Sequence, residues 1–202
     1  MPARGSERGF GSGCGLLRLD SSRQERATVE FVCADSLVAM QQAAWPEAVE
    51  RVAAFLRNGG VETRIEEFGA GTPTAADAAR AVGCKLEQIV KSLVFDCDGR
   101  PFVVLVPGDR RADARKVARA AGCRRAKIVG PDEVRTVTGF AAGAVAPFPL
   151  PKVERVLVDR QVLVHDRVWI GAGSPRHMAT LAPADLMRLA KAEPMDAVVD
   201  AT

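Results

Sequence analysis

The feature that most constrains the fold is a pair of apolar runs separated by Asp98-Gly99. Each run, residues 90–96 and 101–106, is rich in β-branched and aromatic side chains, as buried strands are. The Asp-Gly pair is a strong hairpin signal, because both residues adopt the positive φ of a type I′ turn. The sequence therefore predicts an antiparallel hairpin of two core strands.

Lys91 interrupts the first of these runs near its start, with Val90 and Leu93 as apolar neighbours. Lysine is seldom buried without a partner, because removing an unpaired ammonium group from water costs much free energy. Two interpretations follow: the side chain reaches solvent past the end of the strand, or it emerges in a cleft and binds a ligand. The local sequence alone favours the first interpretation.

Short helices and strands are mixed along the rest of the folded part. Helical spacing and capping residues predict helices at 46–58, 74–82, 114–121, 131–137 and 183–190. Further strands are expected at 61–68, 126–129, 155–158, 162–164 and 168–171. Hairpins outnumber crossovers, so the predicted class is α/β (α+β) with a mixed, mostly antiparallel sheet. We expect this sheet to be curled or barrel-like and surrounded by helices.

The chain is expected to form a single folded domain at 39–202, preceded by a low-complexity, flexible extension at 1–38. With 202 residues it is long enough for one core, and it shows neither an internal repeat nor a second core. The stretch 4–15 consists mainly of Gly, Ser and Arg, which bury too little apolar surface to fold. Its arginines could contact RNA phosphates; the alternative, which we favour, is a dispensable extension.

Charge and cysteine usage narrow the functional classes. A formal net charge of +3 permits a nucleic-acid partner without requiring one. No apolar run approaches the roughly 20 residues of a membrane span, so no membrane partner is expected. The five cysteines are scattered, form no CxxC pair and are accompanied by two histidines, so we expect no metal site. Reduced cysteines are typical of a cytoplasmic protein.

The most unusual loop, residues 138–149, is long and carries no charged side chain. Gly139 and Gly143 allow positive φ or close backbone approach, and Pro147 stiffens the exit. Such a loop offers mainly backbone N–H and C=O groups, which suit a sugar or a carbonyl oxygen. The alternative is an apolar loop packed over the edge of the core, which the composition favours equally.

Two further features each allow a structural and a functional interpretation. His177 follows the glycine-rich turn at Gly173-Ser174, where it could bond a backbone carbonyl or line a pocket. A basic cluster could be a solvated face or could meet a partner that carries phosphates. This cluster consists of Arg110, Arg111, Arg115, Lys116, Arg119, Arg124, Arg125 and Lys127.

A series of motifs occurs in an order that resembles one known family. The series runs Thr72-Pro73-Thr74-Ala75-Ala76-Asp77, Ile89-Val90-Lys91-Ser92-Leu93, Val104-Leu105-Val106-Pro107-Gly108-Asp109, Thr138-Gly139-Phe140, Gly143-Ala144-Val145-Ala146-Pro147-Phe148 and Gly171-Ala172-Gly173-Ser174-Pro175-Arg176-His177. Over residues 40–199 the chain closely resembles the YbaK/prolyl-tRNA-synthetase-associated family of aminoacyl-tRNA deacylases.

The resemblance implies a fold, a reaction and a site. It implies a compact α/β domain that hydrolyses the ester between a wrong amino acid and the 3′ end of a tRNA, without a cofactor. Lys91 matches the family's functional lysine, and Gly143 to Pro147 matches its GxxxP loop, whose backbone lines the aminoacyl-adenosine site. His177 falls in a region that lines the amino-acid pocket of relatives. Further substrate-binding residues are expected in the same motifs: Ser92, Gly139, Ala144, Gly173 and Ser174.

The resemblance also implies partners. Relatives fused to prolyl-tRNA synthetase edit mischarged alanine, and free-standing relatives edit Cys-, Ala-, Ser- or Thr-tRNA. This chain carries no synthetase body, so it resembles a free-standing form that edits tRNA-Pro charged with Ala, Cys or another small residue. The expected partners are aminoacyl-tRNA and prolyl-tRNA synthetase.

The expected reaction requires few catalytic side chains, because an aminoacyl ester is already activated. We expect Lys91 to hold a terminal phosphate or ribose oxygen and so to position the ester. The backbone amides of Gly143 and Ala144 would stabilise the oxyanion, with water as the nucleophile. Two alternatives stay open: a non-catalytic module that binds aminoacyl-tRNA or a synthetase, and hydrolysis of another small ester or nucleotide conjugate.

Overall fold

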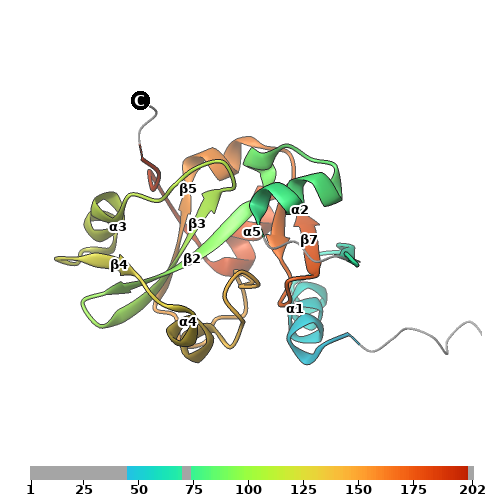
Figure 1. The fold of residues 1–202 in the computed structure, drawn as a ribbon, viewed down its shortest axis with the longest axis horizontal. Coiled ribbons are helices and arrows are strands. Elements are labelled where there is room, and N and C mark those ends of the chain that lie inside the picture. Colours follow the sequence, from blue (N-terminus) through green and yellow to red (C-terminus); the bar gives the residue numbers. More distant parts are fainter. Residues whose placement is uncertain (1–44, 70–73, 200–202) are drawn as a thin grey trace, which may run out of the picture. The chain divides into compact units, whose positions relative to one another are not determined.

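The computed structural model describes residues 45–69 and 74–199, which lie in one compact unit of the chain. The extension predicted at 1–38 lies outside the described residues. The regular elements are α1 (Glu47–Asn58), β1 (Ile65–Glu67), α2 (Ala75–Val82), η2 (Leu86–Gln88), β2 (Val90–Cys97), β3 (Arg100–Pro107), α3 (Ala114–Ala121), β4 (Ala126–Ile128), α4 (Pro131–Thr138), β5 (Arg155–Asp159), η3 (Arg160–Val164), β6 (Val168–Gly171), β7 (His177–Leu181), α5 (Pro183–Ala190) and β8 (Glu193–Met195) (Figure 1).

The predicted hairpin is confirmed and forms the middle of the larger sheet. β2 and β3 pair antiparallel, with Val94 opposite Val103. Both turn residues adopt positive φ, 52° at Asp98 and 84° at Gly99. The five strands of this sheet follow the order β4-β2-β3-β5-β8, and β5 runs parallel to both β3 and β8. The predicted mixed sheet is therefore confirmed: two of its four strand pairings are antiparallel and two are parallel. Antiparallel pairings predominate only when those of the smaller, three-stranded sheet are added.

The expectation of one curled or barrel-like sheet is wrong. β1, β7 and β6 form a separate three-stranded antiparallel sheet, and neither sheet closes on itself. Residues 162–164 were expected to form a strand, but they lie in the 3-10 helix η3. Asp159 starts this helix, because its side chain accepts a hydrogen bond from the Gln161 N–H at 2.8 Å. This side-chain cap ends strand β5 and begins a helix, although the residues that follow are as apolar as those of a strand.

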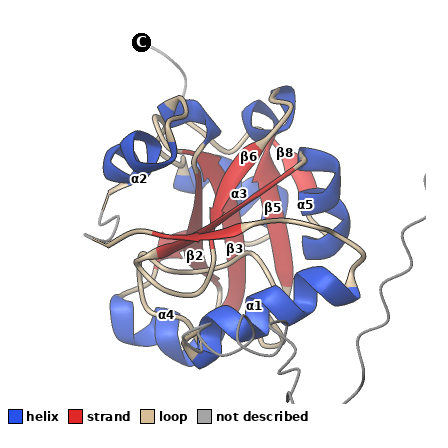
Figure 2. Ribbon diagram, turned by 90° about the vertical axis from the view of Figure 1, so that its right-hand side faces the viewer, coloured by secondary structure: helices blue, strands red, loops and turns tan. Residues whose placement is uncertain are grey.

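Side chains of the strands alternate between the two faces of the larger sheet, and helices pack against each face (Figure 2). Helices therefore surround the strands. Val94 and Leu105 belong to the core shared with α1, α4, α5 and the smaller sheet. Phe95 and Val104 belong to a second core on the opposite face, beneath α3. None of the helices in the described residues is long and apolar enough to cross a membrane.

Asp159 also holds the C-terminal segment, and its loss should be costly. This carboxylate is buried, and its Oδ2 accepts from the N–H groups of Ala197 at 2.6 Å and Val198 at 3.1 Å. Asp159→Ala leaves buried N–H groups without acceptors, so we expect the free energy of unfolding to fall by about 3 kcal/mol. Urea unfolding measures this loss. The exposed Asp166→Ala is the control, expected to change stability by about 0.5 kcal/mol or less, and equal effects of both substitutions would contradict the role of Asp159.

Candidate active site

A cavity of about 240 Å³ lies where the two sheets meet. A parallel bridge between Ile89 and Trp169 joins the residue before β2 to β6 at this point. The walls come from the N-terminus of α2, the start of β2, the loop around Gly143, the end of β6 and the start of β7. The cavity brings together five residues that the sequence singled out: Lys91, Ser92, Gly143, Ser174 and His177.

Lys91 is a half-buried cation in the wall of this cavity. Its Nζ donates a hydrogen bond to the backbone carbonyl of Arg110, in the segment that leads into α3. Burial lowers the pKa of Lys91; the Asp109 carboxylate opposes this shift and the Arg111 guanidinium adds to it. A carbonyl partner leaves the charge without a direct counterion among the described residues. Such a cation is suited to an anionic ligand, which would also reverse the pKa shift.

Ser92 lines the same cavity from the next position of β2. Its Oγ is buried and has no hydrogen-bond partner among the described residues. A buried hydroxyl without a partner costs about 1–3 kcal/mol, and a ligand that bonded it would recover that cost. Ser92 is therefore a candidate contact for a polar group of the substrate.

The charge-free loop packs against the core over most of its length and lines the cavity at Gly143. The side chains of Phe140, Ala144 and Phe148 are buried in the core, as the packing interpretation expects. Gly143 instead lines the cavity, with φ of 83°. Of the two amides expected to stabilise an oxyanion, that of Ala144 donates to the Ala141 carbonyl at 3.0 Å. The Gly143 amide has no backbone acceptor within the described part of the chain.

His177 is the first residue of β7 and is 3% exposed. Its Nδ1 lies 2.6 Å from the Ser174 Oγ, and its Nε2 lies 3.9 Å from Oε2 of Glu67 on β1. Burial lowers the pKa of His177; Glu67 opposes this shift, and the guanidinium of Arg176 adds to it. The lowered pKa favours the neutral form of the side chain at physiological pH. Its Nε2 has no hydrogen-bond partner in the described residues.

The remaining predicted residues lie outside the cavity wall. Gly139 ends α4, with φ of 72°, and its carbonyl accepts a hydrogen bond from Arg51 at 3.2 Å. Pro147 lines a different cavity, next to Phe55 of α1. Gly173 has φ of 93° and packs against the backbone of Ala48. These three positions shape the loops that carry the site.

The sequence did not identify the wall contributed by α2. Thr74, Ala75 and Ala78 line the cavity, and Ala78 packs with Ile89. A capping box correctly predicts this helix: the Thr74 Oγ1 accepts from the Asp77 N–H at 3.1 Å. A capping box predicts where a helix begins, but it does not predict what the helix packs against. The contact between α2 and β2 could therefore not be predicted from the local sequence.

Part of the basic cluster is paired with carboxylates, as expected of a solvated face. Arg124 lies 3.6 Å from Asp98, and Lys127 lies 3.5 Å from Asp96. Such exposed pairs contribute little to stability. Arg111 differs, because it is close enough to Lys91 to affect the pKa of that lysine. Arg111 is therefore the member of the cluster that acts on the cavity, although the opposing effect of Asp109 on the pKa of Lys91 is larger.

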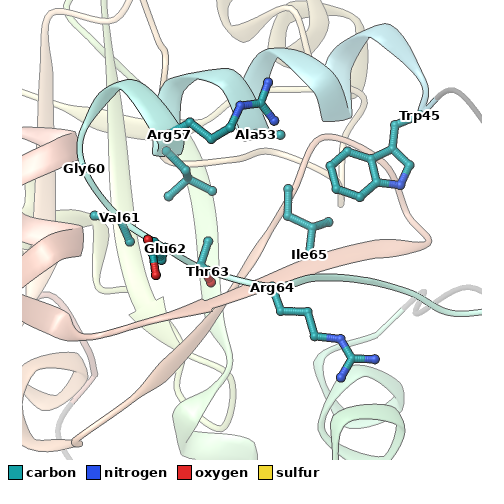
Figure 3. A pocket seen from close by; sticks show the side chains of 10 residues that line it. Trp45, Ala53, Arg57, Gly60, Val61, Glu62, Thr63, Arg64 and Ile65 are labelled. Atoms are coloured by element: carbon teal, nitrogen blue, oxygen red, sulfur yellow. The ribbon is translucent and has the colours of Figure 1, made fainter. Parts of the chain in front are cut away.

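A larger cavity of about 740 Å³ lies between α1 and residues 60–65, with Trp45 at one end and Glu62 at the other (Figure 3). Its arginines have partners: Arg57 lies 2.5 Å from Glu50, and Arg64 lies 3.8 Å from Glu66. None of the buried unpartnered side-chain atoms found in the described residues lines it. The smaller cavity is therefore the better candidate for chemistry.

The profile of the aminoacyl-tRNA editing domain matches residues 70–189, more than half of the 202-residue chain. The chain belongs to this family, as the motif series in its sequence predicted.

Relatives and solved structures agree with this membership. The uncharacterized protein YwhH of Bacillus subtilis is 31% identical over 126 residues, which are 62% of this chain and 80% of YwhH. A proline–tRNA ligase of Nitratidesulfovibrio vulgaris is 32% identical over 100 residues, 50% of this chain but 17% of the ligase. The crystal structure of a proposed trans-editing enzyme for prolyl tRNA synthetase has a TM-score of 0.73 at 34% identity, covering 78% of this chain and all of that one (100%). Hypothetical protein APE2540 has a TM-score of 0.69 at 27% identity, covering 74% of this chain and 99% of that one.

Proposed function

We propose that this protein is an aminoacyl-tRNA deacylase that acts in trans on mischarged tRNA-Pro carrying Ala, Cys or another small residue. The observation that carries the proposal is the convergence of the Lys91 cation and the Gly143 amide in one cavity of an editing-family fold. Prolyl-tRNA synthetase is the proposed functional partner, because part of proline–tRNA ligases matches this chain.

The size of the cavity supports a small aminoacyl group. At about 240 Å³ it is smaller than sites for drug-sized ligands, which are about 300–1,000 Å³. Synthetases reject a slightly smaller or near-isosteric amino acid by only about 10–200-fold, so a second hydrolytic site improves accuracy. A small pocket that admits the wrong amino acid would perform this second selection.

The proposed reaction is attack of water on the ester carbonyl carbon. The carbonyl oxygen becomes an oxyanion that accepts a hydrogen bond from the Gly143 N–H. The bond from the carbonyl carbon to the ribose oxygen then breaks, the ribose oxygen takes up the proton that the attacking water has lost, and the amino acid leaves. Lys91 binds a phosphate or ribose oxygen of the terminal adenosine and holds the ester in place.

A deacylation panel tests this proposal. The purified protein is incubated with tRNA-Pro charged with Ala, Cys, Ser, Thr or Pro, and the released amino acid is measured. We expect release of at least one small noncognate residue and retention of Pro. Uncharged tRNA should compete, and activity should fall steeply as salt is raised, because phosphate contacts release counterions.

The same panel separates the alternatives. A non-catalytic module would bind the tRNA and release no amino acid. An esterase for small esters or nucleotide conjugates would be insensitive to competing tRNA and to salt. Either outcome would contradict the proposed function.

A further inference from the structure

The hydrogen bond between Ser174 and His177 bears on what His177 does in the cavity. A neutral imidazole carries one ring proton, on Nδ1 or on Nε2, and the other nitrogen is an acceptor. With the proton on Nδ1, the free Nε2 would be a potential base for the attacking water. With the proton on Nε2, the side chain is a hydrogen-bond donor instead. The surroundings of the ring discriminate between the two forms.

The contacts of Ser174 favour the form with the proton on Nε2. The Ser174 Oγ accepts a hydrogen bond from the Arg176 N–H at 3.1 Å and lies 2.6 Å from Nδ1 of His177. Within the described residues, Nδ1 is the only hydrogen-bond acceptor found for the hydroxyl proton of Ser174. If Nδ1 carried the ring proton, that hydroxyl proton would have no acceptor among the described residues. These contacts therefore favour a hydrogen bond from the Ser174 hydroxyl to Nδ1, with the ring proton on Nε2.

The surroundings of Nε2 agree with this assignment. The nearest charged group is the Glu67 carboxylate, with Oε2 at 3.9 Å, which attracts an N–H group and repels a lone pair. Arg176 holds this carboxylate in place, with its guanidinium 2.8 Å from Oε1. The distance of 3.9 Å is too long for a hydrogen bond, so the buried Nε2 has no hydrogen-bond partner among the described residues.

We infer that Ser174 holds His177 in the tautomer with its proton on Nε2, so that His177 offers a hydrogen-bond donor, not a base, to the aminoacyl group. Ser174 is then a positioning residue, and the ligand group bonded by His177 is an oxygen acceptor. The part of the inference that concerns the aminoacyl group rests on the proposed function. The tautomer itself does not, because it is a property of the free protein.

The tautomer can be measured directly in solution. The chain has two histidines, His165 and His177, so long-range ¹H–¹⁵N spectra of ¹⁵N-histidine-labelled protein contain two ring patterns. His177→Gln assigns them by removing one pattern. At pH 7.5 we expect the His177 pattern to show the proton on Nε2, and Ser174→Ala to shift it toward the other tautomer without changing His165. A wild-type pattern with the proton on Nδ1 would overturn the inference.

Kinetics supply the second test. Ser174→Ala should lower kcat/KM for deacylation about 5–10-fold, while Ser174→Thr, which keeps the hydroxyl, should retain activity within about twofold. His177→Gln keeps a donor near the position of Nε2 and should retain more activity than His177→Asn. Greater loss in His177→Gln than in His177→Asn would contradict the donor role.

The substrates locate the acceptor and separate this inference from the proposed function. Equal losses on Ala-tRNA and Ser-tRNA for His177→Asn would place the acceptor at the ester, and a larger loss on Ser-tRNA would place it at the side-chain hydroxyl; both outcomes support the inference. No loss on either substrate would overturn the donor role. If wild-type protein releases no amino acid from any tRNA, the proposed function fails, and the spectra still decide the tautomer.

Discussion

Replacing Lys91 with alanine is expected to lower the single-turnover rate of deacylation about 100-fold, because the lost charge-assisted contact positions the ester in the transition state. Lys91 is the half-buried cation of the cavity wall, and its Nζ is tethered only to the Arg110 carbonyl among the described residues. Lys91→Met, which keeps most of the side-chain volume, should lose the same activity. Quenched-flow deacylation of a mischarged tRNA measures both rates.

Stability provides the control for the Lys91 variants. Burial lowers the pKa of Lys91, so its charge is destabilised in the free protein, and this offsets the loss of the hydrogen bond to Arg110. We therefore expect the Lys91 substitutions to change the free energy of unfolding by about 1 kcal/mol or less. Lys85→Ala is the matched substitution, since that side chain is 79% exposed and lies 3.8 Å from Glu87. Lys85→Ala should retain full activity. Activity of Lys91→Ala within about threefold of wild type would contradict the assigned role.

Gly173→Ala is expected to lower the free energy of unfolding by about 3 kcal/mol and to abolish most activity. A Cβ at this position would lie 2.6 Å from the carbonyl oxygen of Ala48 and 2.8 Å from its carbon, at a φ of +93°. Both contacts are to the backbone of α1, so relief requires the helix or the turn to move. The turn carries Ser174 and His177, so movement there disrupts the cavity.

Gly122→Ala is the control that measures how much stability is lost through positive φ alone, without the steric clash expected in Gly173→Ala. Gly122 has φ of +67°, and no atom lies within 4 Å of the position that an alanine Cβ would occupy, so only the backbone conformation opposes alanine. That substitution should cost about 1 kcal/mol and leave deacylation unchanged. Urea unfolding of both variants gives the comparison. Equal destabilisation by the two substitutions would show that the approach of Gly173 to α1 is unimportant.

The parts of the fold that follow from local chemistry were predictable from the sequence. The hairpin follows from Asp98 and Gly99, which both adopt positive φ. Thr74 and Asp113 cap α2 and α3 through their own side chains, each within three residues of its partners. Such signals depend on neighbours in the sequence, so they can be recognised without tertiary structure.

The features that depend on distant contacts were not predictable. The division into two sheets depends on pairings such as Ile65 with Ala179, which lie far apart in the sequence. Local signals do not give the cavity either, because Lys91 and His177 line it together only after β6 and β7 are placed beside the start of β2. The family resemblance alone grouped these residues into one site. The Ser174–His177 contact, by contrast, spans three residues of one turn, in which the His177 N–H donates to the Ser174 carbonyl at 3.1 Å. The Ser174–His177 contact could therefore have been predicted from the sequence, but it was not.

Single-turnover deacylation of Ala-tRNA-Pro and Pro-tRNA-Pro by the wild-type protein tests the central claim most directly. With protein in excess over tRNA, release of each labelled amino acid is compared with spontaneous hydrolysis and with the Lys91→Ala variant; Cys-, Ser- and Thr-tRNA-Pro are measured alongside. The account predicts rapid release of at least one of the small noncognate residues, no acceleration for Pro, and loss of the rapid phase in the variant. Release at the spontaneous rate from all four mischarged tRNAs would contradict it.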